Sequence, residues 1–141
     1  MILILNILDN NNAKWHLLND DQVKEHNFDM LVGEENILPE LAQLVTKEAI
    51  DFSDLSGLAL AIKESSLTQV KVATTILNSL GWQWSIPVVA YFDYLEKEQE
   101  ILAKAKNDLA QKEKFVAIKP EYAKQAEITI SKKKNKFKIE D

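Results

Sequence analysis

Cysteine is absent from this chain of 141 residues, and glycine and proline occur only three times each. Without cysteine the chain has no disulfide, no thiolate metal ligand and no cysteine nucleophile. This composition fits a reducing compartment, and we expect the cytoplasm. The shortage of glycine argues against nucleotide chemistry, because phosphate-binding loops use glycine to bring backbone N–H groups close to the anion.

Long hydrophobic runs are also missing. The apolar stretch 1–8 is too short to span a bilayer, and no basic residues precede it. We therefore expect a strand there, and no membrane association. The net charge of −5 argues against non-specific attraction of nucleic acid by the whole surface. Lysines nevertheless gather near the C-terminus at Lys132, Lys133, Lys134, Lys136 and Lys138.

The composition is that of one globular domain. Hydrophobic residues make up 46% and charged residues 28% of the chain, a balance that buries enough apolar surface to offset the loss of chain entropy on folding. A length of 141 residues is ordinary for one folding unit. We therefore expect a single domain over residues 1–141.

Apolar runs predict the strands of a sheet. Residues 2–5 and 14–18 flank a cluster of turn-forming residues at 9–12, which predicts a hairpin. The continuous apolar runs 58–62 and 86–90 are typical of strands buried on both faces. Two further strands are expected within 23–31 and over 115–118.

Helical periodicity predicts three helices. The first is expected at about 37–47. The second follows Ser66, whose spacing from Gln69 fits a capping box, and is expected to end at Gly81. The third is expected to be capped by Asp93 and to carry an apolar stripe of Leu95, Leu102, Ala105 and Leu109. Strands that alternate with helices indicate a mixed α/β layer fold.

Four segments follow one another in an order and spacing that resemble the TsaB (YeaZ) family. That family has a leucine-proline helix, a turn into a strand, a Gly-Pro-Gly-Ser-Phe-Thr-Gly-x-Arg loop that opens a helix, and an Ile-Pro-Val strand. The corresponding segments here are 37–44, 54–59, 66–73 and 86–89. The resemblance extends to both ends of the chain, through residues 2–6 and the segments 120–122 and 126–129.

The signature loop of the family is degenerate in this chain. Residues 63–69 read Lys-Glu-Ser-Ser-Leu-Thr-Gln, so every glycine of the loop has been replaced. Ser66 and Thr68 remain, and Lys71 stands where the family has arginine. The resemblance therefore depends on the order and spacing of the segments rather than on any single motif.

The resemblance implies an actin-like, Hsp70-like ATPase fold of the ribonuclease H-like type, with a mixed sheet, flanking helices and a second domain that is largely lost. Residues 1–92 would form the conserved N-terminal half, and residues 93–141 would hold a helix, the last strand and the lysine-rich tail. The resemblance also implies a non-catalytic subunit that supports TsaD, the enzyme that transfers a threonylcarbamoyl group to a tRNA adenosine.

The partner implied by the resemblance is a TsaD-like protein in a heterodimer, with a TsaE-like ATPase as a further candidate and a homodimer when the chain is alone. Contact with tRNA would be indirect or through the lysine tail. The first two helices would supply the pairing surface, with Leu38, Leu41, Gln69, Ala73 and Leu77 as interface residues. Of Trp82 and Trp84, one is expected to pack inside and the other to mark an interface.

The residues themselves argue against catalysis. In an actin-like fold the first hairpin grips the phosphates of ATP with an acid and small or hydroxyl residues, whereas this chain has Asn6 and Ile7 in place of the Asp-Thr pair of the family. His16 and His26 are the only histidines, and their spacing fits neither a zinc motif nor an activated serine. We expect no catalytic residue, cofactor or metal ion.

Two alternatives stay open at this point. The chain could be a vestigial nucleotide-binding hydrolase of the same fold, which binding of ATP with magnesium would favour. It could instead be a homodimeric interaction module that has kept the fold and changed its partner.

Overall fold

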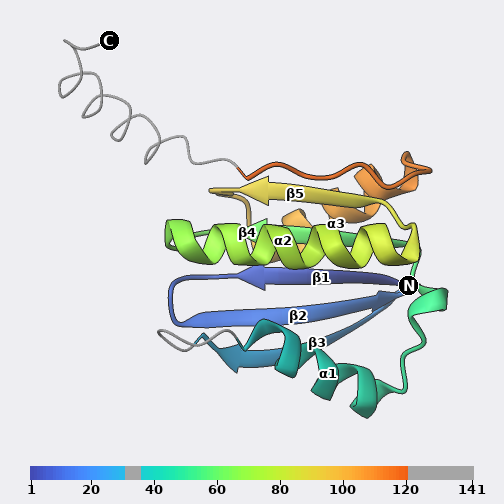
Figure 1. Cartoon of the computed structure of the whole chain (residues 1–141), viewed down its shortest axis with the longest axis horizontal. Helices are drawn as coiled ribbons and strands as arrows, with labels where there is room; N and C mark the ends of the chain where they lie inside the picture. The colour runs from blue at the N-terminus through green and yellow to red at the C-terminus, as the bar shows by residue number, and fades with distance from the viewer. Residues whose placement is uncertain (31–35, 121–141) are drawn as a thin grey trace, which may run out of the picture.

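The computed structural model of the chain describes residues 1–30 and 36–120, which form one five-stranded sheet flanked by helices (Figure 1). The strands are β1 (Ile2–Ile7), β2 (Asn12–Asn19), β3 (Gln22–Asp29), β4 (Gly57–Ile62) and β5 (Val88–Phe92). The helices are α1 (Ile37–Glu48), α2 (Leu67–Trp84) and α3 (Glu98–Ala110), with one 3-10 turn, η1 (Phe52–Asp54).

The strands lie in the order β3-β2-β1-β4-β5. β1 pairs antiparallel with β2 and parallel with β4, β2 pairs antiparallel with β3, and β4 pairs parallel with β5. The mixed sheet with flanking helices confirms the α/β fold class predicted from the sequence. In the part of the chain that the structure describes, no helix has the length and hydrophobicity needed to cross a membrane.

The sheet has two differently covered faces. Helices α1 and α2 lie in front of it in Figure 1, whereas α3 lies behind β4 and β5. Because side chains alternate along a strand, Leu3, Leu5 and Ile7 of β1 join the large core under α1 and α2. Ile4 and Asn6 point to the other face, where Ile4 packs with residues of α3. One strand therefore serves an apolar core on one side and a polar group on the other.

Helix α2 begins as predicted and ends later than predicted. The Ser66 hydroxyl accepts a hydrogen bond from the backbone N–H of Gln69 at 3.2 Å, which confirms the cap. The helix does not stop at Gly81 but continues to Trp84, and Ser85 takes the left-handed conformation that ends it. Gly81 is buried, and a Cβ there would lie 2.4 Å from Cγ2 of Val88. Glycine is needed here for close packing of helix on strand, not for termination.

The start of α3 also differs from the prediction. Asp93 is not its cap, because Asp93 has a φ of 53° and the helix begins only at Glu98. Leu95 lies before the helix and is 94% exposed, so it does not belong to the apolar stripe. The buried face of α3 consists of Ile101, Ala105 and Leu109, with Leu102 half-buried.

The strand predicted over 115–118 is wrong, since this segment pairs with no strand among the described residues. Its backbone bonds to a side chain instead: the Asn78 amide donates to the carbonyl of Ile118 at 2.9 Å and accepts from its N–H at 2.8 Å. A side-chain amide of α2 thus takes the place of a neighbouring strand. The segment 126–129 and the lysine tail fall outside the described residues.

The two edges of the sheet differ in character. Most side chains of β3 are polar and exposed, and two of them pair with α1: Lys24 with Glu48 at 2.6 Å and His26 with Glu40 at 2.7 Å. On the other edge, Val116–Ile118 runs beside β5 and encloses a groove with it. The apolar edge strand β5 is thus flanked by this segment, whereas the edge strand β3 is mostly polar.

Candidate functional site

Three of the five predicted interface residues are buried in the monomer. Leu41, Ala73 and Leu77 are at most 3% exposed and belong to the core between the helices and the sheet. The prediction that they form a partner surface is wrong for this conformation, because their faces of α1 and α2 are turned toward the sheet. Leu38 is 45% exposed and Gln69 is half-buried, so these two remain at the surface.

The tryptophans at the end of α2 both reach the surface, which corrects the expectation that one of them packs inside. Trp82 is 74% exposed. Trp84 is 41% exposed and stacks on Phe52, with 5.5 Å between the ring centroids. Trp82 is therefore the larger exposed aromatic surface of this region.

The degenerate signature loop lies beside the β1–β2 turn. Thr68 and Lys71 are exposed on the outer side of α2, and Ser66 caps its first turn. The Gln69 side chain does not complete the predicted capping box. It accepts from the Ser65 hydroxyl at 2.7 Å and donates to the carbonyl of Asn10 at 3.1 Å. Gln69 thus links the start of α2 to the β1–β2 turn.

The β1–β2 turn binds its own carboxylate. Asp9 accepts from the backbone N–H groups of Asn11 and Asn12 at 2.8 and 2.9 Å, and from the Asn12 amide at 3.0 Å. The hydrogen bond from the Asn11 backbone is the main reason that the pKa of Asp9 lies below its ordinary value. The amides that could bind an external anion therefore already bind an internal one.

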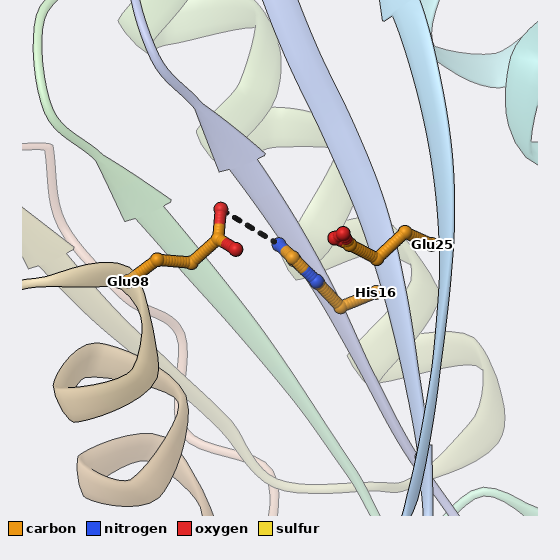
Figure 2. Close-up of side chains that lie close together, drawn as sticks. All are labelled: His16, Glu25 and Glu98. Atoms are coloured by element: carbon orange, nitrogen blue, oxygen red, sulfur yellow. Dashed lines mark ion pairs between the residues drawn. The ribbon is translucent and has the colours of Figure 1, made fainter.

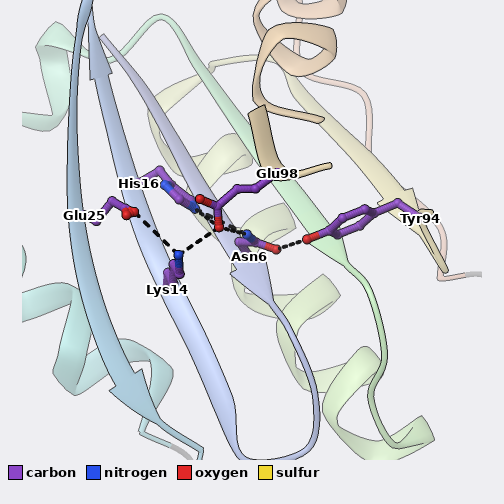
Figure 3. A network of polar contacts seen from close by, with 6 residues as sticks. All are labelled: Asn6, Lys14, His16, Glu25, Tyr94 and Glu98. Carbon is purple, nitrogen blue, oxygen red and sulfur yellow. Dashed lines mark hydrogen bonds and ion pairs between the residues drawn. The ribbon is translucent and has the colours of Figure 1, made fainter. Parts of the chain in front are cut away.

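A second polar group lies on the α3 face of the sheet (Figure 3). We call it the polar cluster, and its members are Asn6 of β1, Lys14 and His16 of β2, Glu25 of β3, and Tyr94 and Glu98 from before and at the start of α3. The register of the strands explains the meeting, because Asn6 is opposite Lys14 and His16 is opposite Glu25. The crossover through β5 then brings Tyr94 and Glu98 back onto the same face.

Asn6 is completely buried and is the centre of this cluster. Its Oδ1 accepts from the Tyr94 hydroxyl at 2.8 Å. Its Nδ2 lies 3.3 Å from Oε1 of Glu98, to which it donates, and 3.3 Å from Nε2 of His16. Burial raises the pKa of Tyr94, so the hydroxyl keeps its proton and donates. The amide of Asn6 has partners on both its oxygen and its nitrogen.

Lys14 supplies the positive charge of the polar cluster. Its ammonium lies 2.9 Å from Oε1 of Glu98 and 3.5 Å from Oε2 of Glu25. The hydrogen bond with Glu98 is the largest cause that raises the pKa of Lys14 above its ordinary value. Two carboxylates that are distant in sequence thus share one cation.

His16 is buried completely, and burial lowers its pKa, although the nearby carboxylates oppose that shift. The imidazole is therefore neutral at pH 7. Because Asn6 donates toward Nε2, the proton of the neutral ring belongs on Nδ1. Nδ1 has no hydrogen-bond partner among the described residues, which is uncommon for a buried polar atom.

The polar cluster holds no activated nucleophile. Among the described residues no serine or threonine hydroxyl is hydrogen-bonded to His16 or His26, as activation of a nucleophile would require. A ring nitrogen of His16 and one carboxylate oxygen each of Glu25 and Glu98 all lie within 4.8 Å of one another (Figure 2). The sequence argument against metal ligands considered only short spacings and missed these three residues, which the fold brings together.

The alternation of side chains along β1 and β2 could have predicted part of the polar cluster. Asn6, Lys14 and His16 are polar residues inside two apolar strands, and the hairpin pairing places them on one face. Glu98 gave no such signal, since its place depends on the path of the chain through β4, α2 and β5.

Comparison with known proteins gives a likeness of structure only. No protein-family model matches the chain, and no curated protein matches it. YeaZ from Pseudomonas aeruginosa superposes with a TM-score of 0.57 at 19% identity, over 64% of this chain and 44% of that one. An uncharacterized protein with similarity to peptidase YEAZ, also from Pseudomonas aeruginosa, gives 0.56 at 18% identity, over 64% and 42%.

This chain therefore covers less than half the length of either structure. At such low identity the likeness shows the fold alone. The chain has a fold distantly similar to that of YeaZ.

Proposed function

We propose that this chain is a non-catalytic, TsaB-like subunit that binds and supports a TsaD-like protein in threonylcarbamoyladenosine modification of tRNA. The observation that carries the proposal is the YeaZ-like fold over 64% of the chain. The order of the sequence segments resembles the same family. A cytoplasmic location and an actin-like origin of the sheet are parts of this proposal, and a sheet in which the antiparallel pairs β3–β2 and β2–β1 precede the parallel strands β4 and β5 is compatible with that origin.

The two charged sites support a role without catalysis. In the β1–β2 turn, Asp9 binds the backbone amides that would otherwise be available to a phosphate. On the α3 face, Lys14 provides the cation that the two glutamates would otherwise draw from solution. Both groups thus already have internal partners. This favours a binding subunit over a vestigial hydrolase.

The outer face of α2 is the best candidate for the partner surface now that Ala73 and Leu77 are placed in the core. Its exposed residues recur at helical spacing: Thr68, Lys71, Thr75, Ser79 and Trp82. Small hydroxyl side chains at Thr75 and Ser79 let a second helix approach closely, and Trp82 offers a large aromatic contact at the end of the stripe. Leu38, on α1, is a separate exposed apolar side chain.

Binding to a purified TsaD-like protein from the same cell tests the proposal. We expect the natural chain to form a heterodimer, and Thr75→Arg to weaken it at least about tenfold, because a long charged side chain would separate the helices. The matched control is Asn107→Arg, an exposed position of α3 on the opposite face. Equal binding by both variants would move the interface away from α2, and absence of any heterodimer would refute the proposed function.

Calorimetric titration with ATP and magnesium separates the hydrolase alternative. We expect no measurable binding, because the turn amides are occupied by Asp9. Saturable binding that depends on magnesium would favour the hydrolase instead.

A further inference from the structure

The outer edge of β5 carries backbone groups that are free to pair with another strand. In the parallel pair of β4 and β5, the N–H of Leu58 donates to the carbonyl of Pro87 at 2.9 Å, so Pro87 and every second residue after it turn their backbone groups toward β4. The N–H and C=O groups of Val88 and Ala90 therefore point away from the sheet. Within the described ranges, no backbone hydrogen bond joins them to the segment 115–118 that runs beside β5 (Figure 1). Such free donors and acceptors are a template for one more strand.

The segment 115–118 is anchored on α2 rather than on β5. The ring of Phe115 lies against Gly81, where an added Cβ would meet it at 2.8 Å. The Asn78 amide binds both the N–H and the C=O of Ile118. Because both ends of the segment are held in this way, it encloses a groove of about 530 Å³ next to β5. Ligand pockets in proteins usually have volumes of about 300–1,000 Å³.

The groove joins apolar walls to one free cation. Its apolar side chains come from β5 and from the segment 115–118, whereas the end of α3 and the two residues after it contribute Asp108, Gln111 and Lys112. The carboxylate of Asp108 already accepts a hydrogen bond from the Tyr91 hydroxyl at 2.6 Å. Lys112 is exposed and makes no ion pair with any residue that the structure describes. The groove can therefore offer a positive charge to a ligand.

The charge around the groove is opposite to that of the whole chain. Residues 104–119 carry five lysines and two acids, hence a net charge of +3, whereas the chain has −5. A positive surface attracts an acidic ligand. It disfavours a second copy of this chain, which would bring the same lysines to the contact. It also disfavours the end of the chain itself, since residues 121–141 carry six lysines and four acids.

We propose that this groove binds an extended, acidic peptide segment of another protein, which pairs with Val88 and Ala90 as an added strand and places a carboxylate on Lys112. In strand addition, main-chain hydrogen bonds provide affinity and alternate side chains provide specificity. Nucleic acid fits less well, because its phosphates would face the outward carbonyls of β5 as well as the lysines. No residue of α2 lines the groove, so this inference does not rest on the proposed function.

Fluorescence anisotropy of labelled peptides, titrated with the full-length chain, tests the proposal. The probe is a short synthetic peptide of alternating glutamate and valine. One control peptide has lysine in place of glutamate, and the other has methylated backbone nitrogens. We expect saturable binding of the probe and at least about tenfold weaker binding of both controls, because the first has the wrong charge and the second cannot donate strand hydrogen bonds.

Variants of the chain locate the binding. Lys112→Glu should weaken binding of the probe at least about tenfold, because it reverses the charge that meets the carboxylate. Lys106→Glu is the matched control, at an exposed position of α3 outside the groove, and should bind the probe as the natural chain does. Ala90→Pro removes only an outward N–H, which an edge strand tolerates, and should also weaken binding. The methylated peptide tests the same hydrogen bonds if this variant does not fold.

Several results would overturn the proposal: no binding of the probe, equal binding by Lys112→Glu and Lys106→Glu, or equal binding of the methylated peptide. Displacement of the probe by a single-stranded oligonucleotide of equal charge would assign the lysines to nucleic acid instead. Slow hydrogen exchange of the Ala90 amide without peptide would show that the edge is already occupied. The occupant would be the end of the chain if the exchange rate is independent of protein concentration, and a second copy if it is not.

Discussion

On the face of the sheet covered by α1 and α2, β1 and β2 present Leu3, Leu5, Trp15 and Leu17 to a continuous apolar core. On the face toward α3, the same two strands present a short apolar patch followed by the polar cluster. A single hairpin thus builds both environments by alternation alone. The apolar contacts that stabilise this chain and its buried ionic contacts therefore lie on opposite faces of the same two strands.

The difference extends to the helices. α2 contributes a full apolar face to its side of the sheet, whereas α3 buries only Ile101, Ala105 and Leu109 and places Glu98 over the strands. Substitutions on the first side should therefore act on the free energy of unfolding. Substitutions on the second should act on its dependence on pH and ions.

Ala73→Arg is expected to have the largest effect. Ala73 is completely buried in the apolar core, so an arginine there would bury an unpaired charge and destabilise the fold by about 4 kcal/mol or more. Urea denaturation measures the loss, and Thr75→Arg, two residues away on the exposed side, is the control. A stable Ala73→Arg variant would mean that this face of α2 does not pack in the apolar core.

Gly81→Val tests the same face at the point where α2 approaches β5. The added Cβ would meet the side chains of Val88 and Phe115 at 2.4 and 2.8 Å, so we expect a loss of about 2 kcal/mol. In an ordinary helix interior, replacing glycine usually increases stability. A gain in the free energy of unfolding would show that the helix and strand separate more easily than this close contact indicates.

His16→Gln tests the polar face through pH. The pKa of His16 is lowered in the folded chain, so the unfolded chain binds a proton first as pH falls below about 6.5, its ordinary value. The natural chain should then lose up to about 1.4 kcal/mol of stability per pH unit below that value. Stability curves from pH 8 to 5 should lack this loss in His16→Gln and keep it in His26→Gln. A natural chain that becomes no less stable below pH 6.5 would contradict a neutral, buried His16.

Asp9→Ala is expected to have the smallest effect, in the turn that joins the two strands. The lowered pKa of Asp9 means that its hydrogen bonds stabilise the fold above about pH 3.8, its ordinary value, and stop doing so as pH falls through the folded value. The variant should unfold at a lower urea midpoint than Asp21→Ala at pH 7. The two should converge at pH 2, and a difference that persists there would assign the effect to something other than the carboxylate.

Local patterns were enough for much of the fold. The apolar runs at β1 and β4 and the helical spacing of α1 and α2 depend on neighbouring residues, and so does the Ser66 cap, so all of them could be predicted. The errors came where contacts distant in sequence decide the outcome. Gly81 is predicted as a helix terminator from its neighbours alone, because the close approach of Val88, which leaves no room for a Cβ at position 81, cannot be seen along the chain.

The candidate site was harder to predict for the same reason. Strand pairing could have placed Asn6 beside Lys14 and His16, but Glu98 reaches them only through two crossovers. The failed strand at 115–118 is a related case, since an apolar, β-prone segment found its hydrogen bonds on the side chain of Asn78. Contacts between residues that are close in sequence could thus be predicted, whereas contacts that depend on the path of the chain could not.

The contrast between the sheet edges has a practical consequence. Exposed hydrogen-bonding edges are the places where sheets of different molecules join into aggregates and fibrils. Here one edge strand, β3, carries Lys24 and Glu25 among mostly polar residues, and the other, β5, is flanked by Val116–Ile118. Concentrated preparations of this chain should therefore resist fibril growth, and a variant that replaces both Lys24 and Glu25 with valine should be the first to lose that resistance.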